Sequence, residues 1–404
     1  MPLEFATAAI FILTYAGVAI GRFPGLRLDR AGIALTGAAF TIAVGAISPE
    51  EAYRAIDLDT LALLLGMMIV VGHLRLSGFF RLAARWALAH AHSQPVFLLA
   101  VAATAGFLSA FLVNDAVCLV MAPLVIETTR ALKREPVPYL LAVAMASNAG
   151  SAATITGNPQ NMIVGAVSRI PYAQFAAALA PTAIFGVALV VVLVASASPR
   201  EFFPVVRFGA GDAKARVNKP QMVKAALVTI GVVALFFAGA PVGEAAMLGG
   251  ALLLVTRSIK ADKVYREIDG SLLLLFAGLF VVVAGAEKVL LSGDVLARAH
   301  SAHLENVWAL TAVTAALSNV ISNVPAVLAL KPFVQGMPDP RQLWLVVAMS
   351  STLAGNLTLV GSVANLIVAE KARQAGIEIS FWAYARIGVP LTLLTLALGA
   401  WRLS

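Results

Sequence analysis

The chain has 404 residues, of which 60% are hydrophobic and 12% are charged. Because about 25% of the residues in soluble globular proteins are charged, this composition excludes an ordinary soluble domain. The net charge of +8 does not indicate nucleic-acid binding, because the basic residues lie between apolar segments of membrane-spanning length. The single cysteine excludes an intrachain disulfide, and no Cys/His spacing predicts a metal site.

The apolar segments of the first half, residues 1–197, predict five membrane spans and one re-entrant hairpin. Segment 5–20 lacks the basic start and the cleavage site of a signal peptide, so we expect it to be a span. The later elements are expected at 31–47, 60–72, about 96–131 (the hairpin), about 138–166 (a broken helix) and 174–195.

A linker at 198–223, rich in proline and charge, precedes a second half, 224–404, with the same order of elements. Its hairpin is expected at about 306–333 and its broken helix at about 342–369. Its other expected spans include the apolar segments 225–239, 271–286 and 386–401.

The basic residues predict which loops are cytoplasmic. Most of them fall in the loops 21–30, 73–95, 128–136, 197–224, 257–268 and 370–375, which we place in the cytoplasm. The loop 48–59 carries four acidic residues and one arginine, which suits the outside, so both termini are predicted to be periplasmic.

The segment 96–131 is apolar but lies between two basic loops, so it must cross the membrane an even number of times or return. We expect a re-entrant hairpin broken near Asn114–Asp115. Such a tip is tolerated at membrane depth only where it is buried in protein or lines a cavity.

The two halves are related by an internal duplication. Residues 147–164 match residues 351–368 at a constant offset of 204, and residues 108–125 match residues 317–334. An odd number of spans in each repeat makes the second repeat inverted. The predicted fold is therefore an all-α polytopic membrane protein of two inverted repeats, each with five spans and one hairpin. Duplicated segments interrupted by Gly, Pro and Asn indicate a transporter's binding site near the midplane.

The candidate binding residues are the polar and glycine positions at the two hairpin tips and at two helix breaks, expected at Thr154–Asn161 and Thr358–Asn365. An interrupted helix exposes N–H groups at one start and C=O groups at the other end, which suit anions and small cations respectively. The alternative is that small polar residues only join neighbouring helices. The full set is Asn114, Asp115, Ser147, Asn148, Thr154, Thr156, Gly157, Asn158, Asn161, Ser322, Asn323, Asn356, Thr358, Gly361, Ser362 and Asn365.

Asp115 makes the predicted site asymmetric, because its repeat partner is Val324. An ionisable side chain inside the membrane marks an ion or proton pathway by default. A second interpretation is that Asp115 caps the hairpin's second helix. Both interpretations stay open, and one residue can serve both.

Four motifs, VND…AP, TITGNPQN, SNVPAV…KP and LTLVGSVAN, resemble the ion transporter superfamily. This superfamily groups the arsenite permeases, the NhaD-type sodium/proton antiporters and the divalent anion/sodium symporters. The resemblance implies a homodimer in which a scaffold holds a mobile, elevator-type transport domain. We expect a proton or sodium ion as coupling ion and no other cofactor. Dicarboxylate symporters usually show Ser-Asn-Thr at the tips, whereas here the tips are Val113-Asn114-Asp115 and Ser322-Asn323-Val324.

The sequence therefore predicts a secondary active transporter of the inner membrane that moves a small anion or a neutral oxyacid. The alternatives are an arsenite/antimonite efflux permease, a Na⁺/H⁺ antiporter and, from another class, a passive anion channel. No paired acids, His cluster or Ser with a general base converges within the spans, which argues against an enzyme. The expected partners are the lipid bilayer, the substrate and a second copy of the chain, with no nucleic acid.

Overall fold

The computed structural model describes residues 3–21, 28–83, 92–203, 205, 219–255, 259–290 and 304–404, and these residues form helices and connecting turns. Much of the linker 198–223 and parts of the basic loops 21–30 and 73–95 lie outside the described residues. The helices of the first half are α1 (Leu3–Ile20), α2 (Arg30–Ala43), α3 (Pro49–Ala55), α4 (Leu58–Ser77), α6 (Gln94–Phe111), α7 (Asn114–Ala131), α8 (Pro136–Ser151), η1 (Ile155–Gly157), α9 (Pro159–Ser168), α10 (Tyr172–Ala197) and α11 (Pro199–Phe202).

The second half repeats this order. Its helices are α12 (Lys219–Phe237), α13 (Val242–Leu254), α14 (Ala261–Tyr265), α15 (Gly270–Leu290), α17 (Val307–Ile321), α18 (Asn323–Gln335), α19 (Pro340–Ala354), η2 (Leu359–Gly361), α20 (Val363–Gln374) and α21 (Phe381–Leu403). Among the described residues, seven helices are long and apolar enough to cross a membrane, and α2, α13 and α17 are shorter apolar helices. The all-helical polytopic fold predicted from the sequence is confirmed. The inversion of one repeat relative to the other stays a prediction.

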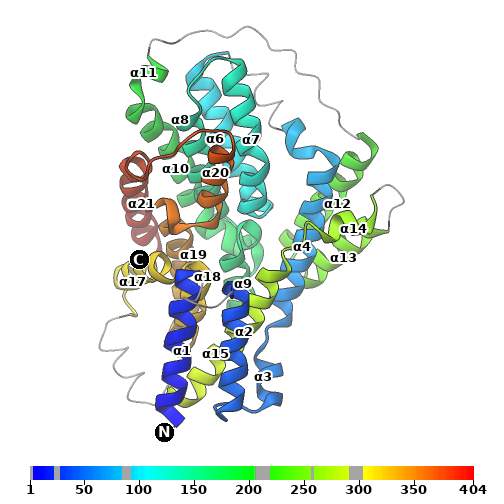
Figure 1. Ribbon diagram of the computed structural model, residues 1–404, viewed down its shortest axis with the longest axis vertical. Coiled ribbons are helices and arrows are strands. Elements are labelled where there is room, and N and C mark those ends of the chain that lie inside the picture. The colour runs from blue at the N-terminus through cyan, green and yellow to red at the C-terminus, as the bar shows by residue number, and fades with distance from the viewer. Residues whose placement is uncertain are drawn as a thin grey trace.

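The helices pack into two groups. The first, which we call the scaffold group, contains α1–α4 and α12–α15, with α2 packed on α15 and α4 packed on α13. The second, the hairpin group, contains α6–α11 and α17–α21. In Figure 1 the hairpin α6–α7 and helix α8 occupy the upper end, while α1, α2, α3 and α15 occupy the lower end. The groups meet where α1 contacts α17, α15 contacts α18 and α4 contacts α9.

The hairpins and breaks lie close to their expected positions, with two differences in detail. The first hairpin turns at Leu112–Val113, so Asn114 already begins α7. The second turns at Ser322, whose φ of 75° is unusual for a residue with a side chain. The helix breaks lie earlier in the chain than expected, because α8 ends at Ser151 and α19 at Ala354, and the chain becomes helical again at Pro159 and Val363. Asn161 and Asn365 therefore lie in the first turns of helices, since proline or a capping side chain starts each helix earlier.

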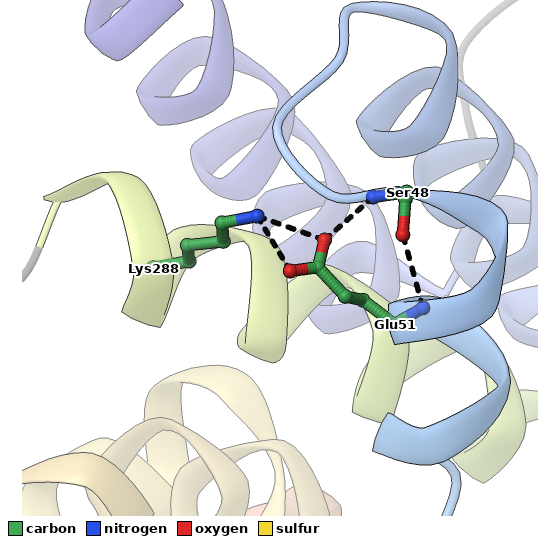
Figure 2. Close-up of polar contacts among 3 residues, drawn as sticks. All are labelled: Ser48, Glu51 and Lys288. Atoms are coloured by element: carbon green, nitrogen blue, oxygen red, sulfur yellow. Dashed lines mark hydrogen bonds and ion pairs between the residues drawn. The ribbon is translucent and has the colours of Figure 1, made fainter.

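The scaffold group is joined at its lower end by a polar contact between the two repeats (Figure 2). Ser48 and Glu51 form a capping box at the start of α3, and Lys288 of α15 donates to both Glu51 carboxylate oxygens at 2.7 and 2.8 Å. The hydrogen bond from Lys288, followed by the backbone N–H of Ser48, holds the pKa of Glu51 below its usual range. This contact links α3 of the first half to α15 of the second.

Candidate functional site

A cavity of about 80 Å³ lies where both hairpins and both broken helices meet the scaffold group. We call it the central cavity. The first residues of four helices form much of its wall. They are Asn114 and Asp115 of α7, Pro159 and Gln160 of α9, Asn323, Val324 and Pro325 of α18, and Val363 of α20, joined by the capping residues Ser322 and Ser362.

The four helix starts give the cavity a positive backbone field. The first N–H groups of a helix have no intrahelical acceptor, and the helix dipole adds a partial positive charge at the same end. No side chain caps α7 or α18, whereas Asn158 caps α9 and Ser362 caps α20. Four such ends around one small cavity favour an anion or an oxygen-rich neutral molecule.

Asp115 brings a carboxyl group into the same cavity. Asn114 Oδ1 accepts a hydrogen bond from the backbone N–H of Asp115 at 3.0 Å. Within the described ranges, the carboxyl group of Asp115 makes no ion pair. The ionised carboxylate of Asp115 and an anionic substrate would both be attracted to the positive helix starts. They would repel each other, so they compete for this site while Asp115 is ionised.

In each helix break, one asparagine side chain donates hydrogen bonds to backbone carbonyl oxygens. Asn161 Nδ2 donates to the carbonyl oxygens of Ser151 and Thr154 at 3.2 and 2.9 Å. Its repeat partner, Asn365, donates to the carbonyl oxygens of Gly355 and Thr358 at 2.8 and 3.2 Å. The two pairs of acceptors are again 204 positions apart, so the sequence duplication is also a duplication of contacts.

The two broken helices are also hydrogen-bonded to each other. Asn148 Nδ2 donates to Asn365 Oδ1 at 3.0 Å, and the residue 204 positions later, Thr352, donates to Asn161 Oδ1 at 3.1 Å. Each repeat therefore supplies the group that satisfies the side-chain oxygen of the other repeat's asparagine.

Asn148 is the centre of this network. Besides the bond to Asn365, its Nδ2 donates to Asn356 Oδ1 at 3.1 Å. Its Oδ1 accepts from Asn114 Nδ2 and from Ser362 Oγ, both at 3.0 Å. Two donated and two accepted bonds use the full capacity of an amide side chain. Asn148 is 2% exposed, so the first hairpin tip and the second break are joined through one buried residue.

The remaining predicted residues hold the hairpins against the breaks. Ser147 Oγ lies 2.8 Å from Ser109 Oγ and donates to the carbonyl oxygen of Asn114. Thr154 bonds to the carbonyl oxygen of Ala110, and Thr358 bonds to Asn319 Oδ1 at 3.5 Å.

The first break is further fixed by Thr156 and Gly157. The Thr156 hydroxyl lies 2.8 Å from that of Tyr172. At Gly157, an added Cβ would lie 2.0 Å from the carbonyl oxygen of Ser151, so only glycine fits. Gly361 holds the equivalent place in the second break.

The structure divides the predicted residues into two sets. Asn114, Asp115, Ser322, Asn323 and Ser362 line the central cavity. The others, namely Ser147, Asn148, Thr154, Thr156, Gly157, Asn158, Asn161, Asn356, Thr358, Gly361 and Asn365, form the network behind it or the breaks themselves.

Sequence reasoning missed three residues. Gln160 lines the cavity and donates to Thr352 Oγ1 at 3.2 Å, and it could have been found as part of the TGNPQN motif. Thr352 could have been found as the repeat partner of Asn148. Arg30 lines the cavity from the scaffold group, and no motif marks it.

The fold and the site define a multi-pass membrane transporter. The model of the CitMHS citrate transporter family matches residues 10–342, and the chain belongs to this family. It is similar to a 46 kDa membrane protein of Mycobacterium leprae, with 31% identity over 420 residues, covering 96% of this chain and 95% of the relative. It is also similar to the silicon efflux transporter LSI3 of Oryza sativa subsp. japonica, with 29% identity over 448 residues and coverage of 93% and 92%.

A solved structure has the same fold. The crystal structure of the YdaH transporter of Alcanivorax borkumensis matches with a TM-score of 0.62 at 15% identity. The match covers 99% of this chain and 97% of that one. The expected resemblance to the ion transporter superfamily is confirmed, and the chain is a secondary transporter rather than an enzyme.

Proposed function

We propose that this protein moves a small anion or a neutral oxyacid across the bacterial inner membrane, coupled to protons or sodium. The observation that carries the proposal is the convergence of four helix starts on the central cavity. The N–H groups there that no capping side chain uses are donors for carboxylate, oxyanion or hydroxyl oxygens.

The size of the cavity favours a compact substrate. One water molecule needs about 10–15 Å³ of such a volume, whereas pockets for drug-sized ligands are about 300–1,000 Å³. A volume of about 80 Å³ suits a small oxyacid, or one acidic group of a longer molecule. The matched family is described by citrate and the rice relative by silicon, so family membership alone leaves the substrate open.

Asp115 is the proposed coupling residue. An ionised carboxylate repels an anion bound at the same helix starts, and protonation removes that repulsion. Binding of a proton at Asp115 and of an anion in the cavity then favour each other, which is the requirement for coupled transport.

The hydrogen-bond network supports movement of the hairpin group as one body. Rocking one repeat against the other would break the bonds from Asn148 to Asn365 and from Thr352 to Asn161. Sliding along the boundary with the scaffold group leaves them intact. On the scaffold side of the cavity, that boundary includes the apolar Val18, Leu272 and Leu275. This arrangement supports an elevator-type step.

The test is accumulation of arsenite, phosphate and citrate in everted membrane vesicles, energised by a proton or a sodium gradient. Wild type is compared with Asp115→Asn and with Asp262→Asn, an exposed acidic residue of α14 that serves as the matched control. We expect wild type and the control to accumulate a substrate against its gradient. Asp115→Asn should lose the gradient-driven part while retaining substrate exchange. Equal gradient-driven accumulation by wild type and Asp115→Asn would show that Asp115 is not the coupling group.

A further inference from the structure

A basic side chain from the scaffold group, Arg30, reaches the central cavity. Arg30 is the first residue of α2, whose amino-terminal end is capped by Asp29 through a 2.8 Å hydrogen bond from the backbone N–H of Gly32. The other scaffold residues of the lining, Val18 of α1 and Leu272 and Leu275 of α15, are apolar. Among the described residues, Arg30 is therefore the polar contribution that the scaffold group makes to this lining.

The guanidinium group of Arg30 lies against Gly21, at the end of α1. Gly21 has a φ of +81°, and an added Cβ there would lie 3.3 Å from Nε and 3.6 Å from Nη2 of Arg30. A residue with a side chain would crowd the guanidinium and strain the backbone. Gly21 thus leaves room for the guanidinium group of Arg30 beside the end of α1.

Arg30 makes no ion pair within the part of the chain that the structure describes. Two scaffold carboxylates near the cavity are already used as helix caps, Asp29 for Gly32 and Asp269 for the backbone N–H of Leu272 at 3.0 Å. Asp115 lines the same cavity without forming an ion pair with Arg30. Arg30 therefore brings a guanidinium group with five donors to the lining of the cavity, and among the described residues this group has no fixed anionic partner.

We propose that Arg30 is a binding residue for the anionic group of the substrate, and that it belongs to the site in only one of the two transport states. This inference rests on the proposed function. Asn114, Asn323 and the other helix starts move with the hairpin group, whereas Arg30 stays with the scaffold group. Any displacement of one group along the other therefore separates Arg30 from the helix starts.

The charge pattern predicts on which side of the membrane the site is open when it includes Arg30. The ends of α1 and α2 that reach the cavity flank the basic loop 21–30, and the start of α15 follows the basic loop 257–268. Both loops are expected in the cytoplasm. Arg30 then acts on substrate bound from, or released to, the cytoplasmic side.

The first test is cross-linking in native membranes, which requires no knowledge of the substrate. In a Cys118→Ser background, Arg30→Cys is combined with Ser322→Cys, because both positions line the cavity. A short bifunctional thiol reagent should join them. The control pair replaces Ser322→Cys with Ser404→Cys, at the end of the chain, and should not react. Absence of a cross-link in the first pair would overturn the proposed position of Arg30.

The second test measures half-saturating concentrations of citrate and phosphate from each side, in inside-out and right-side-out vesicles. Arg30→Gln should raise the value about tenfold on the cytoplasmic side, as expected for loss of one charge-assisted hydrogen bond, and leave the outer side unchanged. Arg30→Lys should recover part of the affinity. The control is Arg266→Gln, which removes a charge from the exposed loop after α14, outside the cavity lining.

The outcomes separate this inference from the proposed function. Equal effects of Arg30→Gln on both sides, or no effect on either, would refute the one-state role while leaving a functioning transporter. If wild type carries neither anion uphill, the proposal of anion transport fails and the role of Arg30 as an anion contact fails with it. The cross-link still decides whether Arg30 faces the hairpin tip.

Discussion

Replacing Asn148 with alanine is expected to lower the free energy of unfolding by about 2–4 kcal/mol. The side chain makes four hydrogen bonds of 3.0–3.1 Å, to Asn114, Asn356, Ser362 and Asn365. Side-chain hydrogen bonds between membrane helices average about 0.6 kcal/mol, and a buried polar group left without a partner costs about 1–3 kcal/mol. Because all four partners lie inside the protein, water does not replace the lost bonds cheaply.

The assay is equilibrium unfolding of the purified protein in lipid–detergent micelles, by titration with a denaturing detergent. Ser351→Ala is the control, because this residue is equally buried but its hydroxyl bonds within its own helix, to the carbonyl oxygen of Ala348 at 3.3 Å. We expect the control to lie within about 0.5 kcal/mol of wild type. If Asn148→Ala also lies within that margin, the network does not hold the two repeats together and the reasoning is wrong.

Two further predictions concern the helix break and the scaffold contact. Gly157→Ala should lower the free energy of unfolding by about 1–3 kcal/mol, because the added Cβ would overlap a backbone oxygen. The control Gly231→Ala has open space around the added Cβ and should be nearly neutral in the same titration. The pKa of Glu51 is lowered in the folded protein, so its contribution to stability is complete above the unfolded pKa and is lost as the pH falls through the folded value. The melting temperature of wild type should therefore fall more steeply than that of Glu51→Gln between pH ~5 and ~3; parallel curves would contradict the role of the Lys288 contact.

Much of the fold could be predicted because membrane depth restricts what a chain can do. Apolar length predicted the spans, and the charge on both flanks of 96–131 predicted a hairpin, where α6 and α7 pack on each other. That this hairpin re-enters the membrane stays a prediction. The duplication then pointed to Asn114 and Asn323 together, and both line the cavity. The pattern found these two positions together because each tip carries the same residue in both repeats.

The pattern was less informative where function depends on a difference between repeats or on a contact between groups. Thr352 and Asn148 occupy equivalent positions but differ in type, so identity between repeats did not reveal that both cross to the opposite break. Asn161 and Asn365 were expected within the breaks, but each lies in the first turn of the following helix and bonds to carbonyl oxygens of the break. Arg30 was interpreted as a charge that sets orientation, since its position beside the hairpin tips depends on packing of distant segments.

The crossed pair of bonds, Asn148 to Asn365 and Thr352 to Asn161, also bears on the ancestry of the chain. A protein made of one repeat alone would carry both a donor at the first position and an asparagine at the second, yet it could not join them within itself. Two such half-length chains, paired as the two repeats are here, would form both bonds. In the duplicated chain the dependence is mutual, because removal of Asn161 or Asn365 leaves a donor of the other repeat without its acceptor.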